Sequence, residues 1–338
     1  MMISRLSTCV LLGSVSLLLG VHDVTAQNPN IGTAGAKFLK IPVGARASAM
    51  AGASVASIDD ASAVFWNPAG IVGVKSTALL VSYTPWWATT KLSSAVIVAS
   101  LQDVGSIGVS VTSLTMDKMA VTTEQEPEGT GEFFDAGDLM IGFTYARRLT
   151  EDFSVGITAK YVNQRIWNET ANGWAFDIGT QYRIGFRDLT LAMSMTNFGP
   201  DMTFDGRDLS VTYDPNPNIP GNRLTPARLA PEEYPLPLHF QIGISMTVLN
   251  TDEVKVLLAA DAAHPNDNSE RVNVGTEVTV LNQIFLRGGY RFGYDTERAT
   301  FGAGVGVPLG GSTVTFDYSY ALYDLLPNVH RVSLGVSF

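Results

Sequence analysis

Near its end the chain reads Val314-Thr315-Phe316-Asp317-Tyr318-Ser319-Tyr320, a stretch in which apolar and polar residues alternate and which indicates the fold class. Apolar or aromatic side chains occupy every even position, and polar side chains occupy the odd positions between them. Successive side chains of a β-strand point to opposite faces, so the stretch predicts a strand with one apolar and one polar face. Residues 331–338 repeat the pattern and end on Phe338.

The same period of two recurs along most of the chain. Strands of about 9–11 residues span a bilayer when they are tilted, and the alternating runs have that length. We expect about fourteen such strands, near residues 76–84, 92–101, 105–116, 137–148, 152–167, 173–185, 188–198, 236–249, 253–263, 270–281, 283–294, 298–308, 311–322 and 329–338.

The connections between these strands alternate between long and very short. Outer-membrane barrels have short periplasmic turns and longer outer loops, and an even number of strands leaves both chain ends on the short-turn side. The sequence therefore predicts an all-β fold, a transmembrane antiparallel β-barrel. The alternative is a soluble β-sandwich, in which the aromatic residues near the strand ends would pack in a core.

Composition agrees with a membrane barrel. Charged residues make up 16% of the chain, below the roughly 25% that is typical of soluble domains. No apolar run of about 18 residues follows position 26, so no transmembrane helix is expected. The net charge of −10 argues against nucleic acid as a partner.

The N-terminus has the layout of a cleaved secretory signal over residues 1–26. Arg5 precedes an apolar stretch, and Val24-Thr25-Ala26 supplies the small residues of a cleavage site. A lipoprotein reading of Cys9 fails because this cysteine precedes most of the apolar stretch. Without Cys9, the exported chain has no cysteine for a disulfide or a thiolate metal site.

Residues 27–75 precede the first strand of the barrel, which we assign to residues 76–338. Residues 44–57 suit a short helix of small residues, and Asp59-Asp60 caps a second one over residues 61–65. Asn67-Pro68-Ala69-Gly70 then forms a turn that ends it. Such a compact unit fits a barrel lumen as a plug, with lumen-facing arginines binding Asp59 and Asp60. The alternative is a flexible periplasmic leader.

Catalytic and metal sites are not indicated. His239, His264 and His330 are scattered, with no triad or metal-ligand spacing, so no enzyme activity, metal or cofactor is expected. Partner contacts are expected instead at the outer loops. Trp86 and Trp87 at the first hairpin tip anchor either a partner or the lipid interface. The candidates in the longest loop, near 199–235, are Arg207, Arg223 and Arg228.

The two ends of the chain resemble the PorV/PorQ family. At the start, the resemblance is carried by residues 33–47 (TAGAKFLKIPVGARA), Met50-Ala51-Gly52-Ala53 and residues 59–70 (DDASAVFWNPAG). At the end, it is carried by Asp317-Tyr318-Ser319-Tyr320 and by residues 328–334 (NVHRVSL). The segment from Asp60 to Gly70 is also similar to the plug of FadL-type fatty-acid channels.

The resemblance implies a fourteen-stranded FadL-like barrel in outer-membrane lipid, inserted by the barrel-insertion machinery that reads a terminal strand such as the one ending on Phe338. It further implies a shuttle component of type IX secretion, with the translocon and secreted cargo as partners. FadL-like relatives instead pass hydrophobic small molecules, which keeps transport as the alternative function.

Overall fold

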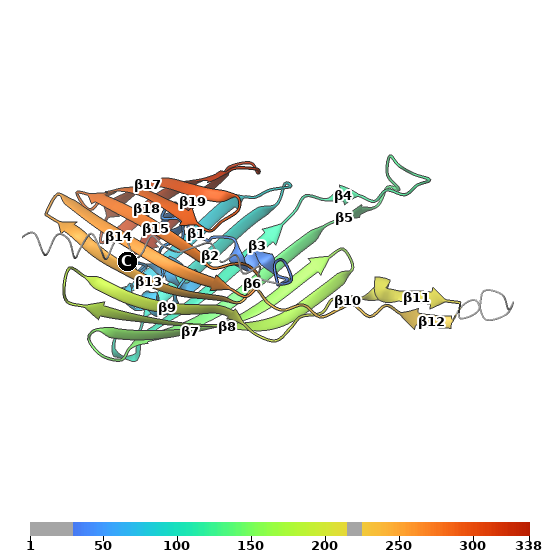
Figure 1. The fold of residues 1–338 in the computed structure, drawn as a ribbon, viewed down its shortest axis with the longest axis horizontal. Helices are drawn as coiled ribbons and strands as arrows, with labels where there is room; N and C mark the ends of the chain where they lie inside the picture. Colours follow the sequence, from blue (N-terminus) through green and yellow to red (C-terminus); the bar gives the residue numbers. More distant parts are fainter. Residues whose placement is uncertain (1–29, 215–224) are drawn as a thin grey trace, which may run out of the picture.

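The computed structural model describes residues 30–214 and 225–338, and within them fourteen strands form one antiparallel barrel (Figure 1). The strands are β1 (Thr77–Pro85), β2 (Lys91–Ser100), β3 (Ser106–Thr115), β6 (Ala136–Arg148), β7 (Phe153–Ile166), β8 (Glu169–Ile184), β9 (Leu189–Phe198), β13 (His239–Asn250), β14 (Val254–Pro265), β15 (Arg271–Val280), β16 (Ile284–Phe292), β17 (Glu297–Leu309), β18 (Ser312–Tyr323) and β19 (Val329–Ser337). The barrel closes because β1 pairs with β19. The predicted barrel is therefore confirmed. The expected signal segment, residues 1–26, lies outside the described residues.

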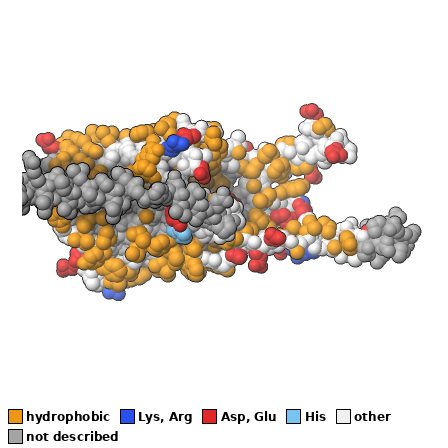
Figure 2. All heavy atoms as spheres, in the orientation of Figure 1, with side chains coloured by type: hydrophobic (Ala, Val, Ile, Leu, Met, Phe, Trp, Pro, Cys, Tyr) orange, Lys and Arg blue, Asp and Glu red, His pale blue; other side chains and the backbone are white. Residues whose placement is uncertain are grey.

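The alternation seen in the sequence separates an apolar outside from a polar inside. On β16, Leu286 is 52% exposed on the outer face, whereas its neighbour Arg287 is 7% exposed and faces the lumen. Figure 2 shows hydrophobic side chains over the outer face of the barrel. An apolar surface of this extent is stable against lipid and not against water, so the structure is that of a membrane barrel.

One end of the barrel carries only tight turns. The turns at Arg187-Asp188 and Leu281-Asn282 have two residues each in the left-handed region, the geometry that suits a two-residue hairpin. Gly310 and Gly311 do the same with φ of 56° and 94°. The long connections all lie at the opposite end, as the sequence predicts for outer loops (Figure 1).

The two longest connections contain strands that the sequence did not predict. β4 (Met119–Ala120) pairs with β5 (Phe133–Phe134), and β11 (Ser210–Tyr213) pairs with β12 (Thr225–Arg228). Both hairpins project beyond the barrel (Figure 1). A short element of the second connection, β10 (Asp205–Gly206), instead adds to β8 and is followed by η5 (Arg207–Leu209). Such short strands carry too few residues for a period of two to be visible.

The described residues before β1, 30–76, contain four short helices, η1 (Lys37–Lys40), α2 (Ala45–Ala49), η2 (Ala61–Phe65) and η3 (Pro68–Gly73). The helix expected over 44–57 stops at Ala49, because Ala51 and Gly52 adopt left-handed backbone conformations. The turn expected at 67–70 is also wrong, since Asn67 caps and begins η3. Within the described part of the chain, no helix has the length and apolarity needed to cross a bilayer.

Candidate functional site

The segment from Asn30 to Lys75, which we call the plug, runs through the lumen from one end to the other. At the long-loop end, Gly32 N donates a hydrogen bond to Asp267 O at 3.2 Å, and Gly35 N donates to Pro235 O at 2.9 Å. At the short-turn end, the plug continues into β1. Its buried residues form clusters with wall residues such as Val98 and Ala146. The plug is thus an internal part of the barrel.

Side chains of the wall hold the backbone of the plug. Asp261 on β14 accepts hydrogen bonds from Ser54 N at 2.8 Å and Val55 N at 3.0 Å, and Thr300 on β17 donates to Ala49 O at 2.8 Å. Buried backbone groups need such partners, so each contact fixes the plug in place. Contacts of the same kind join Gln181 to Ile58 O, Arg291 to Ala51 O, Ser194 to Trp66 O and Ser333 to Ala45 N.

Glycines of the wall make room for the plug. A Cβ atom on Gly289 would lie 2.6 Å from Ala51 N, and one on Gly156 would lie 2.5 Å from Ala69 N. Real Cβ atoms do not approach other atoms so closely, so a side chain at either position forces the plug to move. The lumen-facing glycines that approach the plug in the same way include Gly179, Gly275 and Gly302.

Asn67 of the plug motif is fully buried and ties three segments together. Its Nδ2 donates to Val55 O at 2.8 Å and to Thr180 O of β8 at 3.1 Å, while its Oδ1 accepts from Ala69 N at 3.1 Å. Pro68 follows as the first residue of η3. Gly70 packs so tightly on the Ile58 carbonyl that a Cβ would lie 2.5 Å from it. These contacts indicate a structural role for the motif.

Replacing Asn67 with alanine is expected to loosen the plug without unfolding the barrel. The substitution leaves the Val55 and Thr180 carbonyls without this donor, and such a loss costs about 1–3 kcal/mol. Limited proteolysis of the purified protein should then cut the plug faster than in the parent. Equal rates of cutting would show that the asparagine contributes nothing to plug stability.

A charge network joins the plug to the wall near the short-turn end. Arg46 binds Asp59 at 2.9 Å and Asp60 at 2.7 Å, and its other side binds Glu277 of β15 at 3.1 Å. Arg287 of β16 also binds Glu277, at 2.6 Å. The hypothesis that wall arginines bind Asp59 and Asp60 directly is therefore wrong. The plug supplies its own arginine, which reaches a wall carboxylate.

Asp60 is held in its charged form. Burial opposes ionisation, but the Arg46 guanidinium and hydrogen bonds from Ser62 outweigh it and lower the pKa of Asp60 below its usual value. Asp60 also caps η2 by accepting a hydrogen bond from Ser62 N at 2.8 Å. Asp60 therefore both caps a helix of the plug and neutralises Arg46, which connects the plug to the wall.

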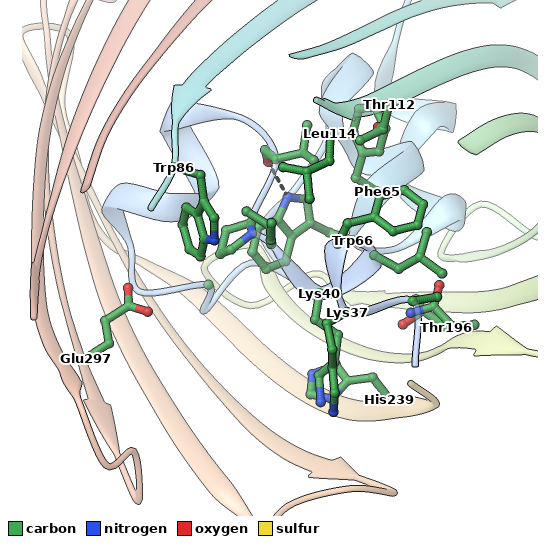
Figure 3. Close-up of a pocket in the computed structure, with 18 of the residues that line it drawn as sticks. Lys37, Lys40, Phe65, Trp66, Trp86, Thr112, Leu114, Thr196, His239 and Glu297 are labelled. Carbon is green, nitrogen blue, oxygen red and sulfur yellow. Dashed lines mark hydrogen bonds between the residues drawn. The ribbon is translucent and has the colours of Figure 1, made fainter. Parts of the chain in front are cut away.

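Two cavities beside the plug share no lining residue among the described residues. A cavity of about 780 Å³, which we call the outer chamber, is lined by plug residues, by strand ends and by residues of the long loops. A second cavity of about 230 Å³ lies toward the short-turn end. Figure 3 shows Lys37, Lys40 and His239 on one side of the outer chamber, with Phe65 and Trp66 nearby.

Trp86 and Trp87 line the outer chamber and are only partly exposed. Trp87 Nε1 donates to Pro327 O at 2.9 Å, and its ring meets the edge of Tyr323 at a centroid distance of 4.9 Å. The Arg331 guanidinium lies 5.7 Å from the Trp86 ring. The structure thus places both tryptophans over the mouth of the lumen.

The other predicted site residues lie apart from the chamber. Arg207 pairs with Asp208, and Arg228 pairs with Asp205, on the projecting loop. Arg223 lies outside the described residues. Phe338 is 61% exposed at the short-turn end, where its N–H donates to Thr77 O at 2.9 Å. The structure does not bring these residues together with the tryptophans or with the plug motif.

Sequence reasoning missed the wall residues that hold the plug, and Asp261 is the clearest case. It stands alone among alanines and leucines in β14 (VKVLLAADAAHP), and an isolated acid in such a strand is the signal that marks it. Of the described residues, no group of three or more His, Cys, Asp or Glu is arranged to hold a metal ion.

Solved membrane-channel barrels share this fold. A Pseudomonas aeruginosa FadL homologue matches with a TM-score of 0.56 at 12% identity, over 88% of this chain and 98% of the other. The Pseudomonas putida toluene transporter TodX matches with 0.54 at 13% identity, over 86% and 96% of the two chains. The CymD monoaromatic hydrocarbon channel matches with 0.52 at 12% identity, over 88% and 97%. The chain therefore has the fold of a FadL-like outer-membrane β-barrel.

Residues 24–186 match the family model of the type IX secretion system protein PorV. This stretch contains the plug and the strands up to β8, and over it the chain is similar to the PorV family. The predicted resemblance is confirmed. None of the curated proteins compared with the chain matches it significantly.

Proposed function

We propose that the protein is a non-enzymatic component of type IX secretion that binds exported proteins at its long-loop end. The observation that carries the proposal is the match to the PorV family over residues 24–186. In this proposal, the partners are the type IX translocon and its cargo. The exposed aromatic end of the last strand, Phe338, serves insertion into the outer membrane.

Two features of the structure support a binding role over an open pore. The plug is bonded to the wall on many sides, and the two cavities beside it share no lining residue among the described residues. The β4–β5 and β11–β12 hairpins project beyond the barrel, where they are available to a large partner (Figure 1). Figure 2 shows acidic side chains on these projections.

Deleting the gene tests the proposal at the level of the cell. Loss of secreted and surface proteins relative to the parent strain supports the shuttle, whereas an unchanged proteome with impaired fatty-acid uptake supports transport. A plasmid copy of the gene restores the parental pattern if the loss is specific.

Shortening the β11–β12 projection is expected to reduce cargo capture while leaving the barrel intact. In the described part of residues 207–228, β11 and β12 carry exposed Val211 and Tyr213 and pair with each other, not with a strand of the barrel. A short Gly-Ser link in their place leaves β9 and β13 joined at their existing register. Pull-down of secreted proteins should fall strongly, and the heat-modifiable migration of the folded barrel should not change. A second variant shortens the other projection, residues 119–134, and equal capture by all three proteins would contradict a role for the projections.

Transport of a hydrophobic small molecule is the second candidate. It is favoured by the likeness to barrels described as a toluene transporter and a monoaromatic hydrocarbon channel. The outer chamber has an apolar side formed by Phe65, Leu114 and Met140. Its remaining lining is rich in amides and charged groups, which suits a hydrocarbon poorly.

A further inference from the structure

The positive charge of the outer chamber gathers on one wall. Lys37 and Lys40 of η1 both pair with Asp267, which is buried in the loop between β14 and β15. Burial together with Arg271 and Lys37 lowers the pKa of Lys40 to about 7, although its ammonium pairs with Asp267 at 2.8 Å. Lys37 and Lys40 therefore share a single carboxylate.

Arg271 is the cation of this wall that has no carboxylate partner among the described residues. It forms no ion pair with any described residue, and its buried Nε has no hydrogen-bond acceptor there. Its guanidinium lies 4.2 Å from the centre of the Tyr294 ring, which orients it along the chamber wall. Arg291 also lies near Tyr294, but Glu297 neutralises it at 2.6 Å. Arg271 is half-buried, and a guanidinium group without an ion pair is a suitable partner for an anion.

Neutral polar groups next to Arg271 are also unsatisfied. Asn273 Oδ1 and His239 Nδ1 are buried without hydrogen-bond partners among the described residues, and both residues line the chamber. Asn273 lies two positions from Arg271 on β15, so both side chains project from the same face of the strand. Figure 3 shows His239 beside Lys37 and Lys40. This wall therefore offers both charge and neutral hydrogen-bonding groups to one ligand.

The rest of the lining indicates what kind of anion fits. Aromatic rings come from Trp66, Trp86, Trp87 and Tyr294, and the amide groups of the lining that remain for a ligand come from Gln241 and Asn273. Amides pair with hydroxyl groups, whereas a hydrocarbon chain would leave them unpaired. Flat rings provide apolar faces for the C–H faces of a sugar. A volume of about 780 Å³ lies within the range of about 300–1,000 Å³ that is usual for small-molecule sites.

We propose that the outer chamber binds an anionic carbohydrate, with its phosphate or carboxylate on Arg271 and Lys40 and its hydroxyls on the chamber amides. Arg271 supplies a planar pair of donors to the oxyanion. Asp138 on the opposite wall and Asp295 at the rim keep a bare polyanion from filling the chamber. The site does not depend on cargo docking by the projecting hairpins.

Binding is tested with the purified full chain in detergent micelles. The probe is glucose 6-phosphate, followed by calorimetry and by fluorescence of the chamber tryptophans. Glucose, inorganic phosphate and decanoate serve as the neutral sugar, the bare anion and the apolar anion. The proposal expects glucose 6-phosphate to bind most tightly of the four. Equal or tighter binding of phosphate or decanoate, or no binding of glucose 6-phosphate, would overturn it.

Arg271→Gln should weaken glucose 6-phosphate binding about ten-fold or more, because it removes a charge-assisted hydrogen bond. Arg298→Gln is the matched control, since Arg298 lies on β17 with its side chain 58% exposed and pairs with Asp324. If Arg271→Gln does not fold, Lys40→Gln takes its place, because Lys37 still neutralises Asp267. Unchanged affinity in the folded variant contradicts the site. Nanodiscs with and without a phosphorylated glycolipid then show whether the sugar is lipid-linked: competition by the glycolipid indicates a membrane source, and its absence indicates a soluble one.

Discussion

Valine at position 289 is expected to displace the plug and turn a closed barrel into a conducting one. Gly289 faces the lumen, where a Cβ atom would lie 2.6 Å from Ala51 N and also overlap the Met50 backbone. The wall is held by strand pairing on both sides, so the plug is the part that yields. Planar-bilayer recordings should show open steps that the parent protein lacks.

The adjacent glycine gives a matched control for this experiment. Gly288 lies on the same strand, but a Cβ there would meet nothing closer than Thr300 O at 3.9 Å. Gly288→Val should therefore remain closed, while Gly156→Val, on the other side of the plug, should open. Heat-modifiable migration confirms that each variant is a folded barrel. A folded Gly289→Val barrel without conductance would mean that the plug accommodates a side chain at position 289 without moving, which contradicts the close contact described above.

Replacing Arg287 with methionine is expected to cause the largest loss of stability. The Arg287 side chain is 2% exposed, and it binds Glu277 and Asp317 at 2.6 Å each. Glu277 keeps Arg46 as a partner, but Asp317 loses the partner that compensates its buried charge. Removing one member of a buried ion pair costs about 3–5 kcal/mol. Urea unfolding in detergent, followed by tryptophan fluorescence, measures the change.

An exposed arginine provides the comparison for Arg287. Arg298 pairs with Asp324 at 2.8 Å near the long-loop end, and surface pairs of this kind contribute roughly 0–1 kcal/mol. Arg298→Met should therefore unfold at nearly the same urea concentration as the parent. The double variant Arg287→Met with Asp317→Asn should recover part of the loss, because it removes the orphaned charge. Similar losses for Arg287→Met and Arg298→Met would refute the buried network.

The strands could be predicted because the residue pattern of each strand reflects the lipid on one of its faces and the lumen on the other. Leu286 and Arg287 are neighbours in the sequence, and the lipid and the lumen require opposite chemistry of them. The charged residues of the strands avoid the centre of the lipid-facing surface, because a charge there is costly. Lys160, Arg287 and Arg291 are buried inside, whereas Arg147, Arg165 and Arg183 lie near strand ends. The predicted start of β8 is four residues too late. The turn before it places Trp167 in the left-handed region, and tryptophan is not a residue type that predicts this conformation.

The contacts of the plug were less accessible to sequence reasoning. Asp60 was recognised as a helix cap because its partner, Ser62, is two residues away. The pairing of Arg46 with Glu277 joins residues 231 positions apart, and no local pattern reports it. Trp86 and Trp87 likewise looked like a partner or lipid anchor, whereas the fold turns them toward the chamber and Pro327.

The sequence alone determined the barrel, its number of strands, which face of each strand meets lipid, and the presence of a separate N-terminal unit. Those features follow from local alternation and loop length, since a strand in a bilayer has only two faces. Only the tertiary structure decided where the plug sits, which wall residues hold it, and that Arg271, Asn273 and His239 share a chamber. Closing the barrel brings distant strands around one axis, and contacts across a lumen depend on that closure.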